Sequence, residues 1–214
     1  MNDLVKKGIV ELAKVIWASD DLKFSDTERT RGLREDILRK LLALAMTDDE
    51  RAAMLGLPGG CRVRESAKII SPENLYCGEY VWIGENAVLD ASGGLQIGSH
   101  TTLAVGALVW THSSVLANLE LDNRSGNPWI VRKPTIIGRG CYIGGPSSIY
   151  PGVTIGNKVI VLPMSVVTDD VPDNVMVGGS PAKIIRVIDE KWIAHYREQH
   201  GLAHQTAVEP TKPV

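Results

Sequence analysis

Histidine is the side chain whose chemistry is most readily inferred here, because an imidazole can take a proton from a hydroxyl group near neutral pH. The 214-residue chain has five histidines, at positions 100, 112, 195, 200 and 204. We expect His195, His200 and His204 to face solvent, because they fall in a final helix and tail. We expect His100 to be structural at a turn. His112 directly precedes a long segment without a repeating pattern, where functional residues often gather, and it is our candidate catalytic residue.

Metal and nucleotide sites find less support in the sequence. A catalytic zinc site can use three histidines, but the repeat region described below holds only His100 and His112, so we predict no metal site. The three cysteines form no CxxC pair, and Cys77 and Cys141 fit small core positions. Gly138-Arg139-Gly140 resembles part of a nucleotide-binding loop, but no helix is expected after it.

Composition limits the class of protein further. The net charge of −2 and the pI near 6.2 show no basic excess of the kind that binds nucleic acid. An odd number of cysteines and no continuous apolar segment favour a cytoplasmic protein without disulfides or a membrane span. Aromatic residues make up 5% of the chain against 44% hydrophobic residues, so the core must be filled by aliphatic side chains.

A period of six residues explains that aliphatic core. The clearest run of the repeat is Ile137, Ile143, Ile149, Ile155, Val161 and Val167. One short strand and one turn use six residues, and three such units close a triangular coil. The aliphatic residue then points inward and stacks on its counterpart about 4.8 Å away in the next coil. The pattern predicts a mainly β protein, a parallel β-helix of hexapeptide repeats.

The repeat also divides the chain. We predict a helical region over 1–60, the β-helix over 61–180, a helix over 181–201 and a disordered tail over 202–214. The hexads stop between 115 and 134, which predicts a loop leaving the coil. In the helical region, Thr47-Asp48-Asp49-Glu50 fits a capping box.

The chain resembles the hexapeptide-repeat acyltransferases over roughly residues 75–188. The similarity rests on the hexads, on Thr111-His112 before the loop, and on Pro151-Gly-Val-Thr-Ile-Gly156. The segments Val166–Pro172 and Val177–Arg186 add to it. The branch it most resembles is that of the galactoside, maltose, nodulation-factor and polysaccharide O-acetyltransferases. The resemblance implies a left-handed β-helix and a homotrimer with acetyl-CoA between neighbouring subunits, where the loop walls the acceptor site.

The resemblance also implies roles for individual residues. His112 matches the general base that accepts the proton of the attacking hydroxyl. Gly145 matches a position whose backbone amide faces the thioester. Tyr142 stands where relatives often carry Trp beside the cofactor arm, and Thr168 matches a CoA contact. Lys183 and Arg186 match a basic pair for the cofactor's phosphates, with first-turn helix charges as the alternative.

Acceptor contacts are less defined. Asp90 follows a repeat aliphatic and could contact the acceptor, or it could simply cap a turn. Trp110 and Trp129 flank the loop and lie outside the inward positions, so their rings are available to a sugar face. Arg124, with Arg132 and Lys133, could receive a carboxylated sugar.

Two departures from the family pattern concern CoA. Relatives commonly carry a basic residue where Asp169 stands, and many offer a backbone N–H where Pro163 has none. We therefore predict an acetyl-CoA-dependent O-acetyltransferase of sugars or glycans whose contacts to CoA differ from those of its relatives. N-acetylation of a nucleotide-linked amino sugar and a non-catalytic β-helix scaffold are the alternatives.

Overall fold

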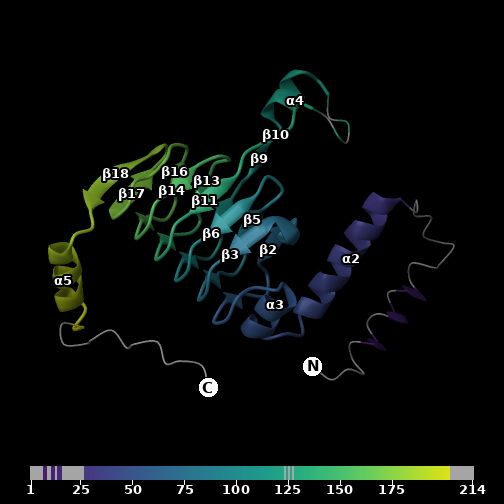
Figure 1. The fold of residues 1–214 in the computed structure, drawn as a ribbon, viewed down its shortest axis with the longest axis horizontal. Coiled ribbons are helices and arrows are strands. Elements are labelled where there is room, and N and C mark those ends of the chain that lie inside the picture. Colours follow the sequence, from purple (N-terminus) through teal and green to yellow (C-terminus); the bar gives the residue numbers. More distant parts are fainter. Residues whose placement is uncertain are drawn as a thin grey trace.

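The protein is a prism of stacked coils with helices at both ends (Figure 1). A computed structural model describes residues 27–122, 124, 126 and 128–202, together with positions 7, 8, 11, 12, 14 and 15. The predicted tail beyond residue 202 lies outside the described residues.

Three parallel sheets form the faces of the prism, each strand contributed by a successive coil. The first face contains β1 (Arg62–Val63), β4 (Trp82–Ile83), β7 (Thr102–Leu103), β12 (Tyr142–Ile143), β15 (Ile160–Val161) and β17 (Val175–Gly179). The second contains β2 (Lys68–Ile70), β5 (Val88–Asp90), β8 (Leu108–Val109), β13 (Ser148–Ile149) and β16 (Val166–Val167). The third contains β3 (Leu75–Cys77), β6 (Leu95–Ile97), β11 (Thr135–Ile137) and β14 (Thr154–Ile155). A short 3-10 turn, Pro72–Asn74, precedes β3.

The repeated aliphatic residues stack in the interior as the period predicts. Ile143 pairs in register with Leu103 below it and Val161 above it, and all three are completely buried. The small residue of each hexad occupies the narrow corner, and Ala87, Ala107 and Val159 are likewise completely buried. The predicted fold class, a left-handed parallel β-helix of hexapeptide repeats, is confirmed.

One corner of the prism turns through a left-handed backbone residue in every coil. These residues are Gly60, Tyr80, His100, Gly140, Lys158 and Asn174, with φ between 52° and 73°. The rings of Tyr80 and His100 stack there with centroids 5.0 Å apart, so His100 belongs to a structural column.

The N-terminal helices cover the first coil. They are α2 (Glu28–Ala43) and α3 (Asp48–Met54), and the Thr47 amide donates to the Glu50 carboxylate at 2.8 Å, as in a capping box. Arg51 is buried and joins these helices to the coil by donating to the carbonyls of Ala43 and Val63 and by pairing with Asp48.

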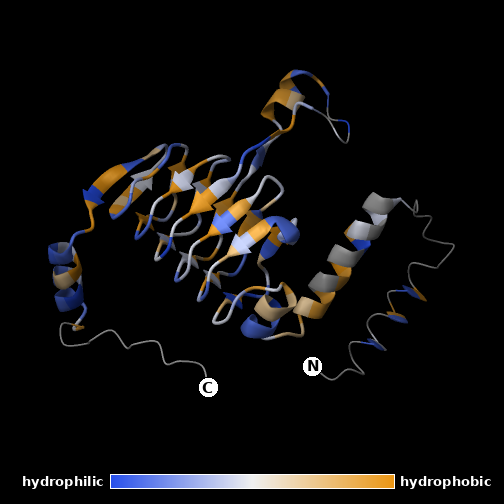
Figure 2. Cartoon of the chain, in the orientation of Figure 1, coloured by the Kyte–Doolittle hydropathy of each residue, from blue (hydrophilic) through white to orange (hydrophobic). Residues whose placement is uncertain are grey.

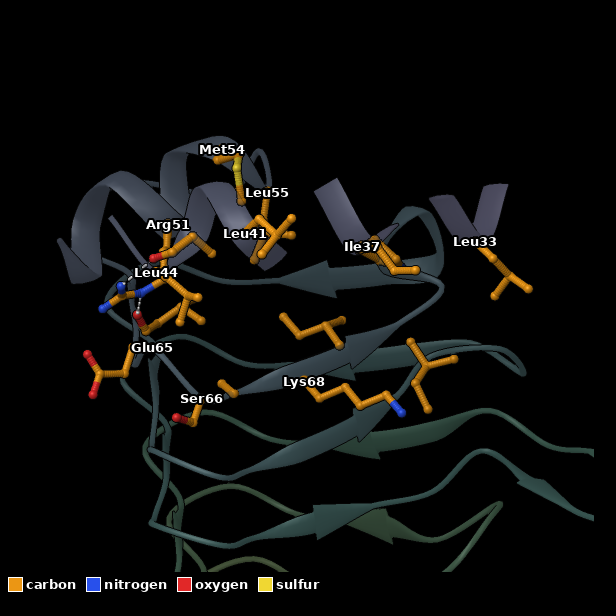
Figure 3. Close-up of a pocket in the computed structure, with 16 residues that line it drawn as sticks. Leu33, Ile37, Leu41, Leu44, Arg51, Met54, Leu55, Glu65, Ser66 and Lys68 are labelled. Carbon is orange, nitrogen blue, oxygen red and sulfur yellow. Dashed lines mark hydrogen bonds between the residues drawn. The ribbon is translucent and has the colours of Figure 1, made fainter. Parts of the chain in front are cut away.

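An apolar cavity of about 740 Å³ lies between α2 and the first coil (Figure 3). Leu33, Ile37 and Leu41 of α2 face it from one side, and the strand that holds Lys68 faces it from the other. This cavity contains none of the predicted site residues.

The predicted helix over 181–201 is wrong in its first part. Residues 182–187 form β18 (Ala182–Val187), which pairs antiparallel with β17. Helix α5 (Glu190–Gln199) begins only after Asp189, whose side chain accepts from the Trp192 amide at 2.7 Å. The edge of the first sheet offers unpaired backbone groups, and β-branched Ile184 and Ile185 suit the strand that covers it.

The segment without hexads leaves the prism as an arm. It begins with β9 (His112–Ser113) and α4 (Val115–Leu119) and returns through β10 (Val131–Arg132), which pairs antiparallel with β9. Figure 1 shows the arm projecting from the coils, and Figure 2 shows that α4 is mostly apolar. The site described next lies at its base.

Candidate active site

His112 lies where the chain turns from the prism into the arm. It follows β8 by three residues and opens β9, opposite Arg132 in the two-stranded ladder. Its side chain is one-third exposed. The imidazole can therefore reach solvent or a ligand while the coil beneath it holds its position.

Asp90 holds the imidazole from below. Its Oδ2 atom lies 2.7 Å from Nδ1 of His112, and Ser92 Oγ lies 3.3 Å from the same nitrogen. The strands explain this contact, because β5 pairs with β8 with Leu89 opposite Val109. Asp90 thus ends its strand one coil below the point where the chain departs toward His112.

The carboxylate determines which nitrogen of His112 carries a proton. An ionised carboxylate only accepts hydrogen bonds, so Nδ1 of the neutral ring is the donor to Asp90. The other nitrogen, Nε2, then presents a lone pair that can accept a proton. The same division of roles orients the histidine of a Ser-His-Asp triad.

Asp90 is fully buried, and its charge is completely engaged. Its Oδ2 accepts from the amide of Thr111 at 2.9 Å and from the Thr111 hydroxyl at 3.0 Å, and its Oδ1 accepts from the amide of Ser92 at 3.1 Å. Burial by itself would raise the pKa of Asp90, but the hydrogen bonds from Thr111, Ser92 and His112 outweigh it and hold that pKa well below its usual range. Asp90 is ionised at neutral pH.

These contacts correct the predicted role of Asp90 in acceptor binding. A side chain with no exposed surface cannot touch an acceptor. The turn-capping alternative is nearer to the structure, since Asp90 accepts the Ser92 amide. Its bond to His112 makes it a positioning residue as well.

Thr111 and Gly93 pack the base of the site. The Thr111 hydroxyl also accepts from the Gly93 amide at 2.8 Å. A Cβ atom on Gly93 would lie 2.3 Å from the Thr111 carbonyl oxygen, so only glycine allows this approach. The Gly93-Gly94 corner therefore fixes the backbone that carries His112.

A pocket of about 430 Å³ opens above His112. Its walls come from the coils that hold β8 and β13 of the second face and from the base of the arm. Its lining residues are Trp110, His112, Ser113, Val115, Val131, Lys133, Ser148, Tyr150 and Pro151. The ring of Trp110 meets the His112 ring edge to face at 6.5 Å. The pocket places a proton acceptor beside aromatic and aliphatic surface.

The other predicted acceptor residues lie in the arm, outside this pocket's lining. Trp129 is 42% exposed. Arg124 makes two hydrogen bonds to the carboxylate of Asp122, at 2.8 and 2.9 Å.

The predicted donor residues lie on another part of the prism. Tyr142 is on β12 of the first face and is 46% exposed. Gly145 turns the corner between the first and second faces, so close to Val105 that a Cβ atom would overlap the Val105 carbonyl oxygen. Neither residue lines the pocket at His112.

Two of the predicted CoA contacts, Thr168 and Lys183, lie beside Asp169. Its carboxylate accepts from the Thr168 hydroxyl at 3.1 Å and lies 3.9 Å from the Lys183 ammonium. Lys183 and Arg186 are both exposed on β18, which excludes the alternative that they are first-turn helix charges. Two exposed cations on one strand fit the phosphates of CoA, although Asp169 competes for Lys183.

Within the described residues, no group of three histidine, cysteine or acidic side chains could hold a metal ion. In the same part of the chain, no helix is long and apolar enough to cross a bilayer.

Several residues of the site were not found from the sequence. Thr111, Ser92, Ser148 and Tyr150 are part of it, and Lys133 was noted only as one of three basic residues in the loop. Aligning the hexads coil by coil would have placed Asp90 below the Trp110-Thr111-His112 segment, because Leu89 and Val109 occupy equivalent positions.

Comparison with known proteins identifies acetyltransferases with similar sequence and fold. No family profile matches the chain. A putative colanic acid biosynthesis acetyltransferase of Escherichia coli is 33% identical over 124 residues, which cover 58% of this chain and 64% of the relative. A hexapeptide-repeat acetyltransferase of Vibrio cholerae, solved with acetyl-CoA, superposes with a TM-score of 0.66 and 28% identity over 78% of this chain and 94% of that one. The chain is similar in sequence to acetyltransferases, and it shares the fold of solved hexapeptide-repeat acetyltransferases.

A maltose O-acetyltransferase of Clostridium difficile shares the fold with a TM-score of 0.61 and 25% identity, over 78% of this chain and 92% of that one. The chain spans 64% of the length of the E. coli relative. This hexapeptide-repeat protein therefore shares the coils of its relatives, while its acceptor has to be inferred from its own site.

Proposed function

We propose that this protein is an acetyl-CoA-dependent O-acetyltransferase that transfers acetyl to a hydroxyl group of a sugar or glycan. The observation that supports this most directly is the pair of Asp90 and His112, which leaves Nε2 free to take a proton. A hydroxyl is a poor nucleophile near neutral pH and needs such a base as it attacks. An amine that has already lost its proton needs a base less, so the pair favours O-acetylation over N-acetylation.

In this proposal the acceptor occupies the pocket above His112 and reacts directly with the donor. Trp110 and Tyr150 offer ring surface for a sugar face, and Nε2 of His112 receives the proton of the attacking hydroxyl. Asp90 stabilises the positive charge that this proton brings to the ring. Acetyl-CoA supplies the acetyl group as a thioester.

The donor requires residues from elsewhere on the prism. Gly145 lies at the corner between the first two faces, and its amide makes no hydrogen bond within the described part of the chain, so it is available to the thioester oxygen. Thr168, Lys183 and Arg186 would bind the phosphates, and the solved V. cholerae relative carries acetyl-CoA.

The separation of these groups supports a homotrimer as the active form. His112 and its pocket follow strands β8 and β13 of the second face, whereas Tyr142 and β18 belong to the first face. We propose that the two sets meet between neighbouring copies, with the arm closing the acceptor side. Three buried, unpaired cysteines are consistent with a cytoplasmic location for this enzyme.

A thiol-release assay tests the function. The protein is incubated with acetyl-CoA and a panel of sugars, oligosaccharides and nucleotide sugars, and free CoA is measured. We expect acceptor-dependent release, and we expect His112→Ala to lower it at least about a hundredfold while the fold is kept. His100→Ala is the matched control, because His100 lies in the structural column at another corner. Equal activity of the His112→Ala variant and wild type would contradict the assignment of the base. If none of the acceptors on the panel causes CoA release, the result would favour the non-catalytic scaffold.

A further inference from the structure

The side chains that line the pocket at His112 include basic residues but no acidic ones. The basic residues are Lys133 and His112. The carboxylate that contacts His112 is that of Asp90, which is fully buried and engaged by Thr111, Ser92 and His112. Lys133 is therefore a cation that the pocket itself does not neutralise.

The fold holds Lys133 in this position at two points. Its amide donates to the Thr111 carbonyl at 2.9 Å, which ties it to the residue preceding His112. Its aliphatic stem lies over Gly152, where an added Cβ atom would approach the Lys133 Cδ atom to 2.9 Å. Thr111 holds the backbone of Lys133 and Gly152 lies under its stem, so that Lys133 forms part of the pocket wall.

The other basic residues of the arm do not share this position. Arg124 is engaged by Asp122. Arg132 is exposed and does not line the pocket. Arg132 lies opposite His112 in the ladder, but of the three basic residues that could meet a carboxylated sugar only Lys133 lines the pocket together with the proposed base.

We propose that the acceptor carries a negatively charged group, with the carboxylate of an acidic sugar as the class that fits, and that Lys133 recognises it. Trp110 and Tyr150 occupy equivalent positions in successive coils, because the Trp110 amide donates to the Ile149 carbonyl. Together they give a ring surface for the sugar, while Lys133 gives an ionic contact at the rim. This inference rests on the proposed function for the reaction, but its binding step can be measured alone.

The first measurement is equilibrium binding by isothermal titration. The probes are a glucuronate-containing tetrasaccharide and the same oligosaccharide after reduction of its carboxyl groups. We expect wild type to bind the acidic form about tenfold more tightly at low salt, and this preference to shrink as salt rises. We expect Lys133→Gln to lose the preference and Lys133→Arg to retain most of it.

Arg139→Gln is the matched control. It removes the same charge from an exposed position at another corner of the prism, and it should leave the preference of wild type unchanged. Equal binding of the two probes by wild type, binding of neither, or an equal loss of preference in the Arg139→Gln variant would overturn the proposal.

The second measurement separates this inference from the proposed function. The ratio of kcat/KM for the acidic probe to that for the reduced probe should fall about tenfold in the Lys133→Gln variant. If binding of the acidic probe depends on Lys133 but no acetyl transfer occurs, the proposed acetyltransferase function is refuted and the proposal of an acidic ligand is supported. Transfer to both probes at equal efficiency would keep the function and refute the acidic acceptor.

Discussion

At the scale of single residues, the site depends on one buried carboxylate. Asp90 is ionised without a lysine or arginine partner, because backbone amides, Thr111 and Ser92 supply its hydrogen bonds. His112 completes this set and is thereby fixed in orientation and in the position of its proton. A positioning residue of this kind affects the rate without touching the acceptor.

Replacing Asp90 with Asn should show that role. We expect kcat for acetyl transfer to fall at least about tenfold, with a smaller change in the KM of the acceptor, because the ring loses the acceptor that fixes its proton on Nδ1. Nitrogen-15 NMR of labelled histidine should report Nδ1 protonated in wild type and a mixture of tautomers in the variant. Asp173→Asn is the control, since Asp173 holds the Asn157 amide at a remote corner. An unchanged tautomer and rate in Asp90→Asn would contradict the role.

The same substitution predicts a pH dependence of stability. Because the folded-state pKa of Asp90 is lowered, its stabilising contribution is present above the unfolded-state value of about 3.9 and is lost as pH falls below it. The difference in melting temperature between wild type and Asp90→Asn should therefore be largest near pH 7 and shrink below about pH 4. Thermal unfolding followed by circular dichroism across this range measures it.

At the scale of elements, each strand of a coil contributes an inward aliphatic side chain that stacks on its counterpart in the next coil. Ile143 pairs in register with Leu103 and Val161 and is completely buried, so its side chain has no solvent contact. Tyr76, on a strand of another face, is 71% exposed. Strands of two or three residues are stable here because every coil repeats this stacking.

Shortening the inward side chain should therefore be costly. We expect Ile143→Ala to lower the free energy of unfolding by about 2–5 kcal/mol, because it leaves a cavity that the neighbouring coils cannot fill. Tyr76→Ala should change it by less than about 1 kcal/mol. Denaturant titration compares them, and similar values for both variants would contradict a core made of stacked hexads.

At the scale of the whole molecule, the two halves of the proposed site lie on different faces of one prism. If neighbouring copies bring them together, one subunit supplies His112 and another supplies Lys183 and Arg186. The arm, whose α4 exposes Val115, Leu116 and Leu119, extends from the prism on the side of the acceptor pocket. We expect the active species to be a trimer, with the mass of three chains of 23.2 kDa each.

Mixed assemblies test this arrangement. His112→Ala should be inactive, and Lys183→Ala with Arg186→Ala should raise the KM for acetyl-CoA. Coexpression of the two variants should restore activity at low acetyl-CoA above the sum of the separate variants, because some interfaces then hold an intact pair. Lys191→Ala, on α5, is a control for the loss of charge. Recovery no greater than the sum, or a monomer by light scattering, would contradict a shared site.

The sequence by itself determined the fold and the proposed base. The period of six specifies the coil. It also specifies which side chains are buried, since a repeat has to satisfy the same packing in every turn, and every sixth residue from Ile137 to Val167 is buried. The position of His112 before the segment without hexads marked it as the residue to examine. The prediction of a helix over 182–187 was wrong, because the pairing of this strand with β17 is a contact between strands that local patterns do not contain.

Only the tertiary structure decided what surrounds His112. Asp90 is 22 residues away in the chain and Lys133 is 21, and stacking of coils and return of the arm bring both to the same place. The sequence allowed two roles for Asp90, acceptor contact and turn capping, and its complete burial excludes acceptor contact. Three basic residues stood in the loop, and the folding of the arm put Lys133 in the pocket and left Arg124 paired with Asp122. Such choices depend on which side chains the coils bring within hydrogen-bonding distance, and a six-residue period does not contain that information.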